Sequence, residues 1–160
     1  WQDTNTRQEE TLAAFDRVIR AGKVRYIGSS NQDAALLGEA LAISQREGLA
    51  RYETVQNKYN LTERKHEAVV EFCEAEGIGF IPWYPVAAGK LAAPGGKLDA
   101  VAKEHQVTVS QISLAWLLQR SPVMLPIPGT FRMSHLEENV AAAKVALTPA
   151  EWGAVEAAAK

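Results

Sequence analysis

Three times in the first half of the chain, an amphipathic helix is followed by a glycine and then by a short apolar strand. Apolar side chains three and four residues apart predict the helices, at residues 7–21, 34–47 and 63–76. Runs rich in β-branched and aromatic side chains predict the strands, at residues 24–28, 52–56 and 78–82. Strands that alternate with helices pair in parallel through crossovers, so the pattern indicates an α/β fold.

The second half of the chain predicts further helices and one more strand. After a stretch rich in glycine and proline at residues 92–96, a short helix is expected at 98–104 and a longer one from Thr108. An apolar run at residues 123–127 predicts a fourth strand. Three sites have the residue types of helix caps, namely Thr62, Ser134 with Glu137, and Thr148 with Glu151.

Composition places the chain among ordinary globular proteins and excludes several classes of partner. It has 160 residues, of which 47% are hydrophobic, and a formal net charge of -2, so we expect one domain spanning residues 1–160. No basic run marks a surface for nucleic acid or for an anionic membrane, and no apolar run is long enough to span a membrane. The single cysteine, Cys73, suits a cytoplasmic protein and is expected to be inert core.

Polar residues after the strands favour a (β/α)8 TIM barrel over an open doubly wound sheet. An open sheet binds its ligand at one switch point, often through a glycine-rich loop after the first strand, and this sequence has no such loop. Polar side chains instead follow every expected strand, as they do in a barrel. Because a closed barrel needs eight strands, we expect the chain to supply about four βα units, or half a barrel.

Four motifs stand at the carboxyl ends of the expected strands. They are KVRYIGSSN at residues 23–31, VQNKYNL at 55–61, IPWYP at 81–85, and IPGT at 127–130 followed by HLEEN at 135–139. In their order and spacing the chain resembles the carboxyl-terminal half of the aldo-keto reductases. The resemblance implies a (β/α)8 barrel, a small-molecule carbonyl substrate and reduction of aldehydes or ketones. It also implies a nicotinamide cofactor, usually NADP, with NAD as the alternative.

A hydroxyl and two amides follow the first two strands. Ser30 and Asn31 offer donors and acceptors that can hold a carboxamide such as that of nicotinamide, and Gln56 can contact the same group. The resemblance assigns this role to Ser30 and Asn31. The residues alone leave another interpretation open, in which these polar groups only satisfy the loop backbone.

An aromatic side chain follows the third strand. Trp83 stands where the family places a ring that stacks on the nicotinamide and fixes which face of it is presented. The resemblance extends the cofactor contacts to Tyr84, Pro85 and Val86, although the family more often has serine at the position of Tyr84 and leucine at that of Val86. By residue type alone, a tryptophan at the end of an apolar strand also fits a core position.

The turn and helix after the fourth strand are expected to hold the adenosine end of the cofactor, because a helix amino terminus attracts phosphate. The resemblance implies that Glu138 and Asn139 contact the adenine. His135 and Gly129 stand where relatives carry basic residues, so Arg132 is the guanidinium available to a 2′-phosphate. A solvated surface charge is the alternative for Arg132. The expected contacts of this segment are Gly129, Thr130, Phe131, Arg132, His135, Glu138 and Asn139.

The chain holds no candidate for the acid that protonates the carbonyl oxygen, so we name no catalytic residue. In the family that acid is a tyrosine from the amino-terminal half of the barrel. Because the chain begins at Trp1 without an initiator methionine, we expect it to be part of a chain roughly twice as long and to be inactive alone.

The remaining titratable residues predict neither a metal site nor a proton donor. His66 and His105 are expected within helices, without clustered metal ligands, and Tyr26, Tyr52 and Tyr59 are expected to pack. Two other functions stay open. One is a cofactor-binding regulatory or assembly module that does not turn over, and the other is a half-barrel that self-associates.

Overall fold

A computed structural model describes residues 1, 3–87 and 97–159 of the chain. These residues form two compact units. The first unit contains Trp1–Asn57 and His66–Ile81, and the second contains Lys58–Lys65 and Pro82–Lys160. The chain passes between the units three times, at residues 57–58, 65–66 and 81–82, and each unit is described by itself.

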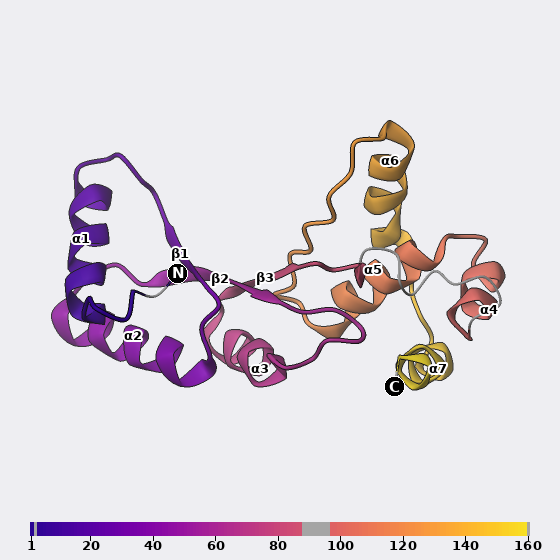
Figure 1. The fold of residues 1–160 in the computed structure, drawn as a ribbon, viewed down its shortest axis with the longest axis horizontal. Helices are drawn as coiled ribbons and strands as arrows, with labels where there is room; N and C mark the ends of the chain where they lie inside the picture. The colour runs from indigo at the N-terminus through magenta and orange to yellow at the C-terminus, as the bar shows by residue number, and fades with distance from the viewer. Residues whose placement is uncertain (2, 88–96, 160) are drawn as a thin grey trace. The chain divides into compact units, whose positions relative to one another are not determined.

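The first unit consists of the repeated helix and strand. Its elements are, in chain order, α1 (Gln8–Arg20), β1 (Ile27–Ser30), α2 (Ala34–Glu47), β2 (Tyr52–Lys58), α3 (Glu67–Glu76) and β3 (Gly79–Trp83) (Figure 1). The strands form one sheet in the order β1-β2-β3, and β1 pairs with β2 in parallel, with Ser30 opposite Gln56. The predicted α/β fold with a parallel sheet is therefore confirmed.

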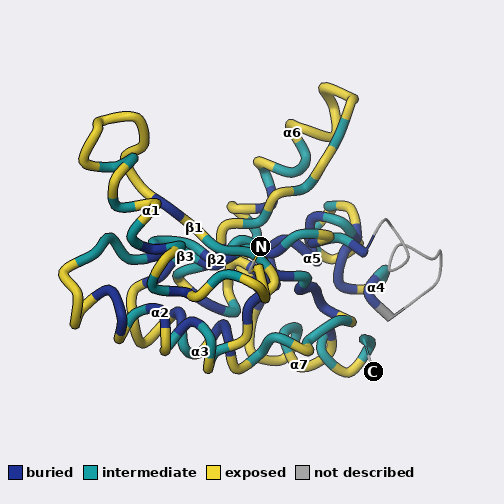
Figure 2. Tube along the Cα trace, turned by 60° about the vertical axis from the view of Figure 1, so that its left-hand side comes forward, coloured by how far each residue is buried: buried dark blue, intermediate teal, exposed yellow. Residues whose placement is uncertain are grey.

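Apolar side chains from helices and strands form the core of the first unit. Leu12, Leu37, Val55, Val70 and Phe80 are each at most 1% exposed, and Figure 2 marks the buried residues along the trace. Burying one such side chain stabilises a fold by about 1.5–3 kcal/mol. Both α1 and α3 pack against α2, so the helices lie where the periodic apolar positions predict.

The first strand begins three residues later than the sequence predicts. It spans Ile27–Ser30 rather than 24–28, and Tyr26, which was expected to pack, is 73% exposed. At Gly28 the backbone approaches β2 so closely that an added Cβ would collide with Thr54 Oγ1. The glycine thus belongs inside the ladder, and pairing continues through the polar residues as far as Ser30.

The second unit is mainly helical. Its elements are the ends of β2 and β3, then α4 (Lys97–Glu104), α5 (Val109–Arg120), α6 (Met133–Ala141), the 3-10 helix η2 (Ala142–Lys144) and α7 (Pro149–Ala158). The indole of Trp116 on α5 is fully buried between Tyr59 and Trp152, with ring centroids 6.0 and 5.5 Å away. This aromatic stack holds α7 against α5.

One helix begins at a residue predicted as its start, and another begins at a predicted cap. Thr108 accepts a hydrogen bond from Gln111 N and begins α5 in a capping box. Thr148 does the same with Glu151 and begins α7, as its spacing predicts. Each such cap stabilises its helix by about 1 kcal/mol.

The other two predicted caps are wrong. Thr62 donates its backbone N–H and its hydroxyl to Asn60 Oδ1, both at 3.0 Å, so it forms a turn and α3 begins only at Glu67. Ser134 lies inside the first turn of α6, whose N-cap is Arg132. Glu137 is therefore an exposed helix residue and not a capping partner.

The predicted fourth strand is also wrong. Among the described residues, 123–127 contain one bridge residue, Met124, and no strand. Leu125 and Ile127 are 52% and 48% exposed. A strand needs a neighbour that completes its ladder, and a sequence pattern does not tell which neighbour is present. In the part of the chain that the structure describes, no helix is long and apolar enough to cross a membrane.

Candidate functional site

Ser30, Asn31 and Gln56 lie together at the carboxyl ends of β1 and β2 in the first unit. Ser30 Oγ donates to the backbone carbonyl of Gln56 at 2.8 Å and accepts from Asn31 Nδ2 at 2.9 Å. The backbone N–H of Asn31 donates to the same carbonyl at 3.1 Å. Asn31 has a φ of 58°, a left-handed conformation that asparagine tolerates better than most residues. The structure thus brings together the three residues that were predicted to contact one carboxamide.

The hydrogen bonds determine which of these groups is free to bind a ligand. The hydroxyl proton of Ser30 is already used, so Ser30 orients Asn31 instead of donating outward. Asn31 Oδ1 and the side-chain amide of Gln56 make no hydrogen bond with a described residue, and Asn31 Nδ2 keeps one proton. Two amides with free donors and acceptors fit a carboxamide, which needs both.

Behind this cluster lies a buried amide that the sequence prediction missed. Asn57, fully buried, donates from Nδ2 to the carbonyl of Gln32 at 2.7 Å and lies 3.2 Å from His66 Nδ1. Because side chains alternate along a strand, Asn57 points to the face opposite Gln56. It therefore ties the loop after β1 to β2, and the polar run from Gln56 to Asn60 was the available signal.

The second unit holds an aromatic pair at the end of β3, formed by the last residue of the strand, Trp83, and by Tyr84. Trp83 is half-buried, Tyr84 is 37% exposed with a φ of 61°, and Pro85 is buried. Asn60, 1% exposed, donates from Nδ2 to the Tyr84 carbonyl at 3.0 Å. The ammonium of Lys58 lies over both rings, 5.9 Å from the Trp83 centroid and 5.6 Å from that of Tyr84. An indole that is not sealed in a core is available for stacking.

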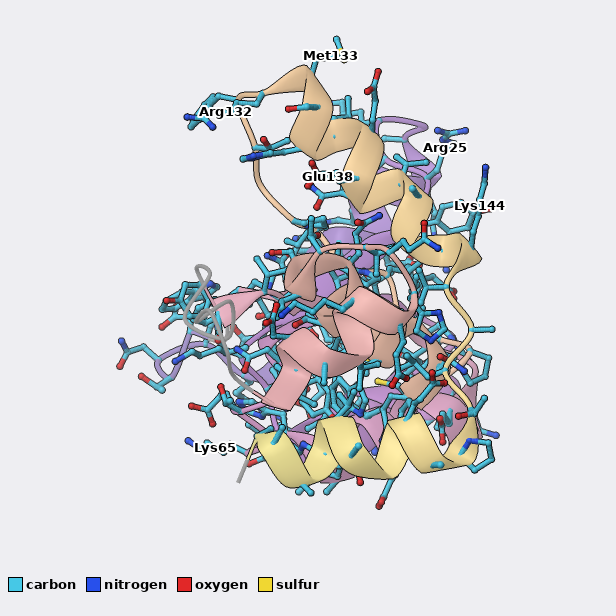
Figure 3. The ribbon with its side chains drawn as sticks, turned by 90° about the vertical axis from the view of Figure 1, so that its right-hand side faces the viewer. Arg25, Lys65, Arg132, Met133, Glu138 and Lys144 are labelled. Carbon is cyan, nitrogen blue, oxygen red and sulfur yellow. The ribbon has the colours of Figure 1, made fainter. Side chains whose placement is uncertain are left out.

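A cavity of about 280 Å³ in the second unit collects the residues expected at the adenosine end. Of the predicted contacts, Val86, Gly129, Thr130, His135, Glu138 and Asn139 line it. Thr108 and Ser110, at the amino end of α5, also line it and were not predicted. Phe131 is fully exposed and does not line the cavity. Arg132 is exposed at the turn before α6, and its side chain extends away from the helix (Figure 3).

The first unit holds another cavity, of about 350 Å³, beside β1. Three buried polar atoms on its wall, Gln8 Oε1, Ser29 Oγ and Gln32 Oε1, have no hydrogen-bond partner among the described residues. Gln8 is 9% exposed and Gln32 is 2% exposed. Burying a polar group without a partner costs free energy. The described residues therefore do not satisfy the hydrogen bonding of this wall.

The structure places no metal site and no activated nucleophile among the described residues. No group of three potential metal ligands occurs there. Cys73 is buried, and burial raises the pKa of its thiol to about 12, which agrees with the expected inert core. His105 follows α4, with Nε2 2.8 Å from Glu151 Oε1, and so has a structural partner. Tyr52 and Tyr59 pack as expected, at 5% and 0% exposure.

Comparison with known proteins decides the family. The family model described as "Aldo/keto reductase family" matches residues 1–160. The chain belongs to the aldo/keto reductase family. The predicted resemblance is thus confirmed, and its relatives are oxidoreductases.

Two relatives and one solved structure show how much of an aldo/keto reductase the chain represents. It is 45% identical over 152 residues to an uncharacterised oxidoreductase of Schizosaccharomyces pombe, covering 92% of this chain and 48% of that protein. It is 36% identical to pyridoxine 4-dehydrogenase of Escherichia coli, covering 88% and 46%. A thermostable aldo-keto reductase solved with the inhibitor epalrestat matches with a TM-score of 0.89 and 35% identity, covering 98% and 57%. The chain spans about half the length of the curated relatives it matches.

Proposed function

We propose that this aldo/keto reductase chain holds the nicotinamide cofactor of an enzyme that reduces aldehydes or ketones to alcohols. The observation that carries the proposal is the cavity of the second unit. Six residues that were expected to contact the cofactor line it together, one from the loop after β3 and five from the turn at 128–130 and α6.

The residues present suit the parts of a dinucleotide. Asn31 and Gln56 would hold the carboxamide through the amides that are free in the structure. Trp83 would present its indole face to the ring, and the hydroxyls and amides of the second-unit cavity would meet the ribose and adenine. A bound nicotinamide cofactor supplies the hydride for the reduction. The protein's part is to orient the ring, so that one face of it meets the carbonyl substrate.

We further propose that NADP is the preferred cofactor, with NAD as the alternative. His135 lies on the cavity wall, and an imidazole N–H would donate a hydrogen bond to a 2′-phosphate. Arg132 lies nearby in the sequence but points outward (Figure 3), so it would have to change rotamer to take part. Titrating the protein with each dinucleotide in turn and comparing the two dissociation constants tests the preference.

The acid that protonates the substrate oxygen is proposed to come from the other half of a longer chain. The incomplete wall beside β1, with its three unpartnered polar atoms, supports packing of further residues there. On this proposal the full-length protein is the enzyme, and residues 1–160 form its cofactor half.

Gln56→Ala in the full-length protein tests the cofactor site. The Gln56 side chain makes no hydrogen bond with a described residue, so its removal is expected to leave the melting temperature unchanged and to weaken NADPH binding about tenfold. Isothermal titration calorimetry measures the affinity. Gln45→Ala, on the exposed face of α2, is the matched control and should bind as the wild type does. Full-length protein that binds neither NADPH nor NADH would contradict the proposed function.

A further inference from the structure

The ammonium of Lys58 lies over both rings of the aromatic pair in the second unit. Lys58 Nζ lies 5.9 Å from the Trp83 centroid and 5.6 Å from the Tyr84 centroid. Both distances are within the range in which an ammonium is attracted to the negative face of an aromatic ring. Lys58 is the last residue of β2, so its charge is held at the end of a strand and not on a surface loop.

Hydrogen bonds around Lys58 fix this arrangement. Asn60 Oδ1 accepts from the backbone of Glu63 at 2.9 Å, and the Glu63 carboxylate lies 3.6 Å from Lys58 Nζ. Asn60 also holds the carbonyl of Tyr84, whose left-handed backbone persists only where its surroundings enforce it. The buried amide of Asn60 thus positions both Glu63, which pairs with the Lys58 ammonium, and Tyr84, whose ring lies under that ammonium.

The charge on Lys58 distinguishes the two redox forms of a nicotinamide ring. The reduced ring is neutral and the oxidised ring carries a positive charge. A fixed cation next to the stacking platform repels the oxidised ring, and it withdraws electron density from the indole that would otherwise stabilise a cationic partner. Glu63 offsets part of this effect, because its carboxylate pairs with the same ammonium.

We propose that Lys58 is a positioning residue that makes the Trp83 platform favour the reduced, neutral nicotinamide over the oxidised, cationic one. The inference rests on the proposed function and adds to it a role for a residue outside the expected cofactor contacts. Such a preference would favour binding of the reduced cofactor, which donates the hydride, and dissociation of the oxidised cofactor after the reaction.

The test compares the affinities for NADPH and NADP⁺ in the full-length protein by isothermal titration calorimetry. Lys58→Met keeps the length of the side chain and removes the charge. It is expected to lower the ratio of the NADP⁺ dissociation constant to the NADPH dissociation constant by about three- to tenfold. Lys58→Arg keeps the charge and should retain the ratio. Glu63→Gln removes the offsetting carboxylate and should raise the ratio.

The outcomes separate this inference from the proposed function. Equal weakening of both forms by Lys58→Met, with no change in the ratio, would show a merely structural role and overturn the inference. If Lys58→Met fails to fold by circular dichroism, the direction of the Glu63→Gln shift decides. Wild-type protein that binds neither form overturns the proposed function as well. Wild-type protein that binds both forms, and loses them in Trp83→Ala while Lys58→Met keeps the ratio, overturns this inference alone.

Discussion

Buried asparagines, more than the exposed charges around them, hold the strand ends in place. Asn57 secures the carbonyl of Gln32 in the first unit, and Asn60 secures that of Tyr84 in the second. Each is at most 1% exposed. A carbonyl removed from water needs a donor, and the short asparagine amide offers one without the conformational freedom of a longer side chain. The residues expected to contact ligand stand on loops that these two amides fix.

Asn60→Ala is expected to lower the free energy of unfolding by about 2 kcal/mol, because it removes the side-chain donor to the Tyr84 carbonyl and leaves the N–H and hydroxyl of Thr62 without their acceptor. Urea unfolding followed by circular dichroism measures the change. The matched control is Asn5→Ala in an exposed turn, where the change should stay below about 0.5 kcal/mol. Equal effects of the two substitutions would show that the Asn60 bonds contribute little.

Residue types at the strand ends were predictable, whereas their bonding was not. Ser30 and Asn31 were expected to hold a carboxamide, and Gln56 to contact the same group, because of their residue types and the family resemblance. The Ser30 hydroxyl donates to the Gln56 carbonyl because the register of β1 against β2 places the two residues opposite each other. The sequence does not predict that register. Lys58 was not expected because its role arises from rings that lie about 25 residues further along the chain.

At the scale of elements, the close contact between β1 and β2 requires a glycine at position 28. Gly28 has no left-handed backbone, so its requirement is space: the carbonyl of Thr54 lies 3.1 Å from where a Cβ would stand, and Thr54 Oγ1 is closer still. The ladder shifts register between Ile27 and Gly28. A larger residue would have to push β1 away from β2 and would disturb the bond from Ser30 to Gln56.

Gly28→Ala is expected to destabilise the protein by about 1–3 kcal/mol, as overpacking does. Adding Thr54→Ala removes the colliding hydroxyl and should recover most of the loss, so the two substitutions are expected to couple in a double-mutant cycle of urea unfolding. Gly153→Ala, on α7 where a Cβ meets nothing within 4 Å, serves as the control and should stabilise by up to about 1 kcal/mol. Additive losses at Gly28 and Thr54 would contradict the steric explanation.

Helices were easier to predict than strands for a physical reason. A helix satisfies its own backbone, so its apolar period and the glycine after it suffice: Gly48 and Gly77 take left-handed φ values of 64° and 65° at the ends of α2 and α3. A strand is defined by its neighbour. The run at 123–127 has the residues of a strand but no ladder among the described residues. The error at Thr62 has a related cause, because its hydroxyl bonds a residue upstream instead of capping the helix after it.

At the scale of the whole molecule, nearly all of this chain matches about half of each relative. The solved aldo-keto reductase described above covers 98% of this chain, which in turn covers 57% of that structure. The sequence predicts cofactor contacts within this chain and offers no candidate for the acid. Tyr52 and Tyr59 are buried, and burial raises the pKa of Tyr52, so neither is suited to donate a proton to a substrate in solution.

We therefore expect the isolated chain of residues 1–160 to show no reductase turnover, whereas the full-length protein oxidises NADPH when given a reactive aldehyde. The physical reason is that orienting a hydride donor does not supply the proton that the developing alkoxide needs. The loss of reduced-nicotinamide absorbance measures turnover in both samples. Light scattering on the isolated chain shows whether two copies pair over the open wall beside β1. Turnover by a monomeric chain would place the acid within these residues and contradict the division of roles argued above.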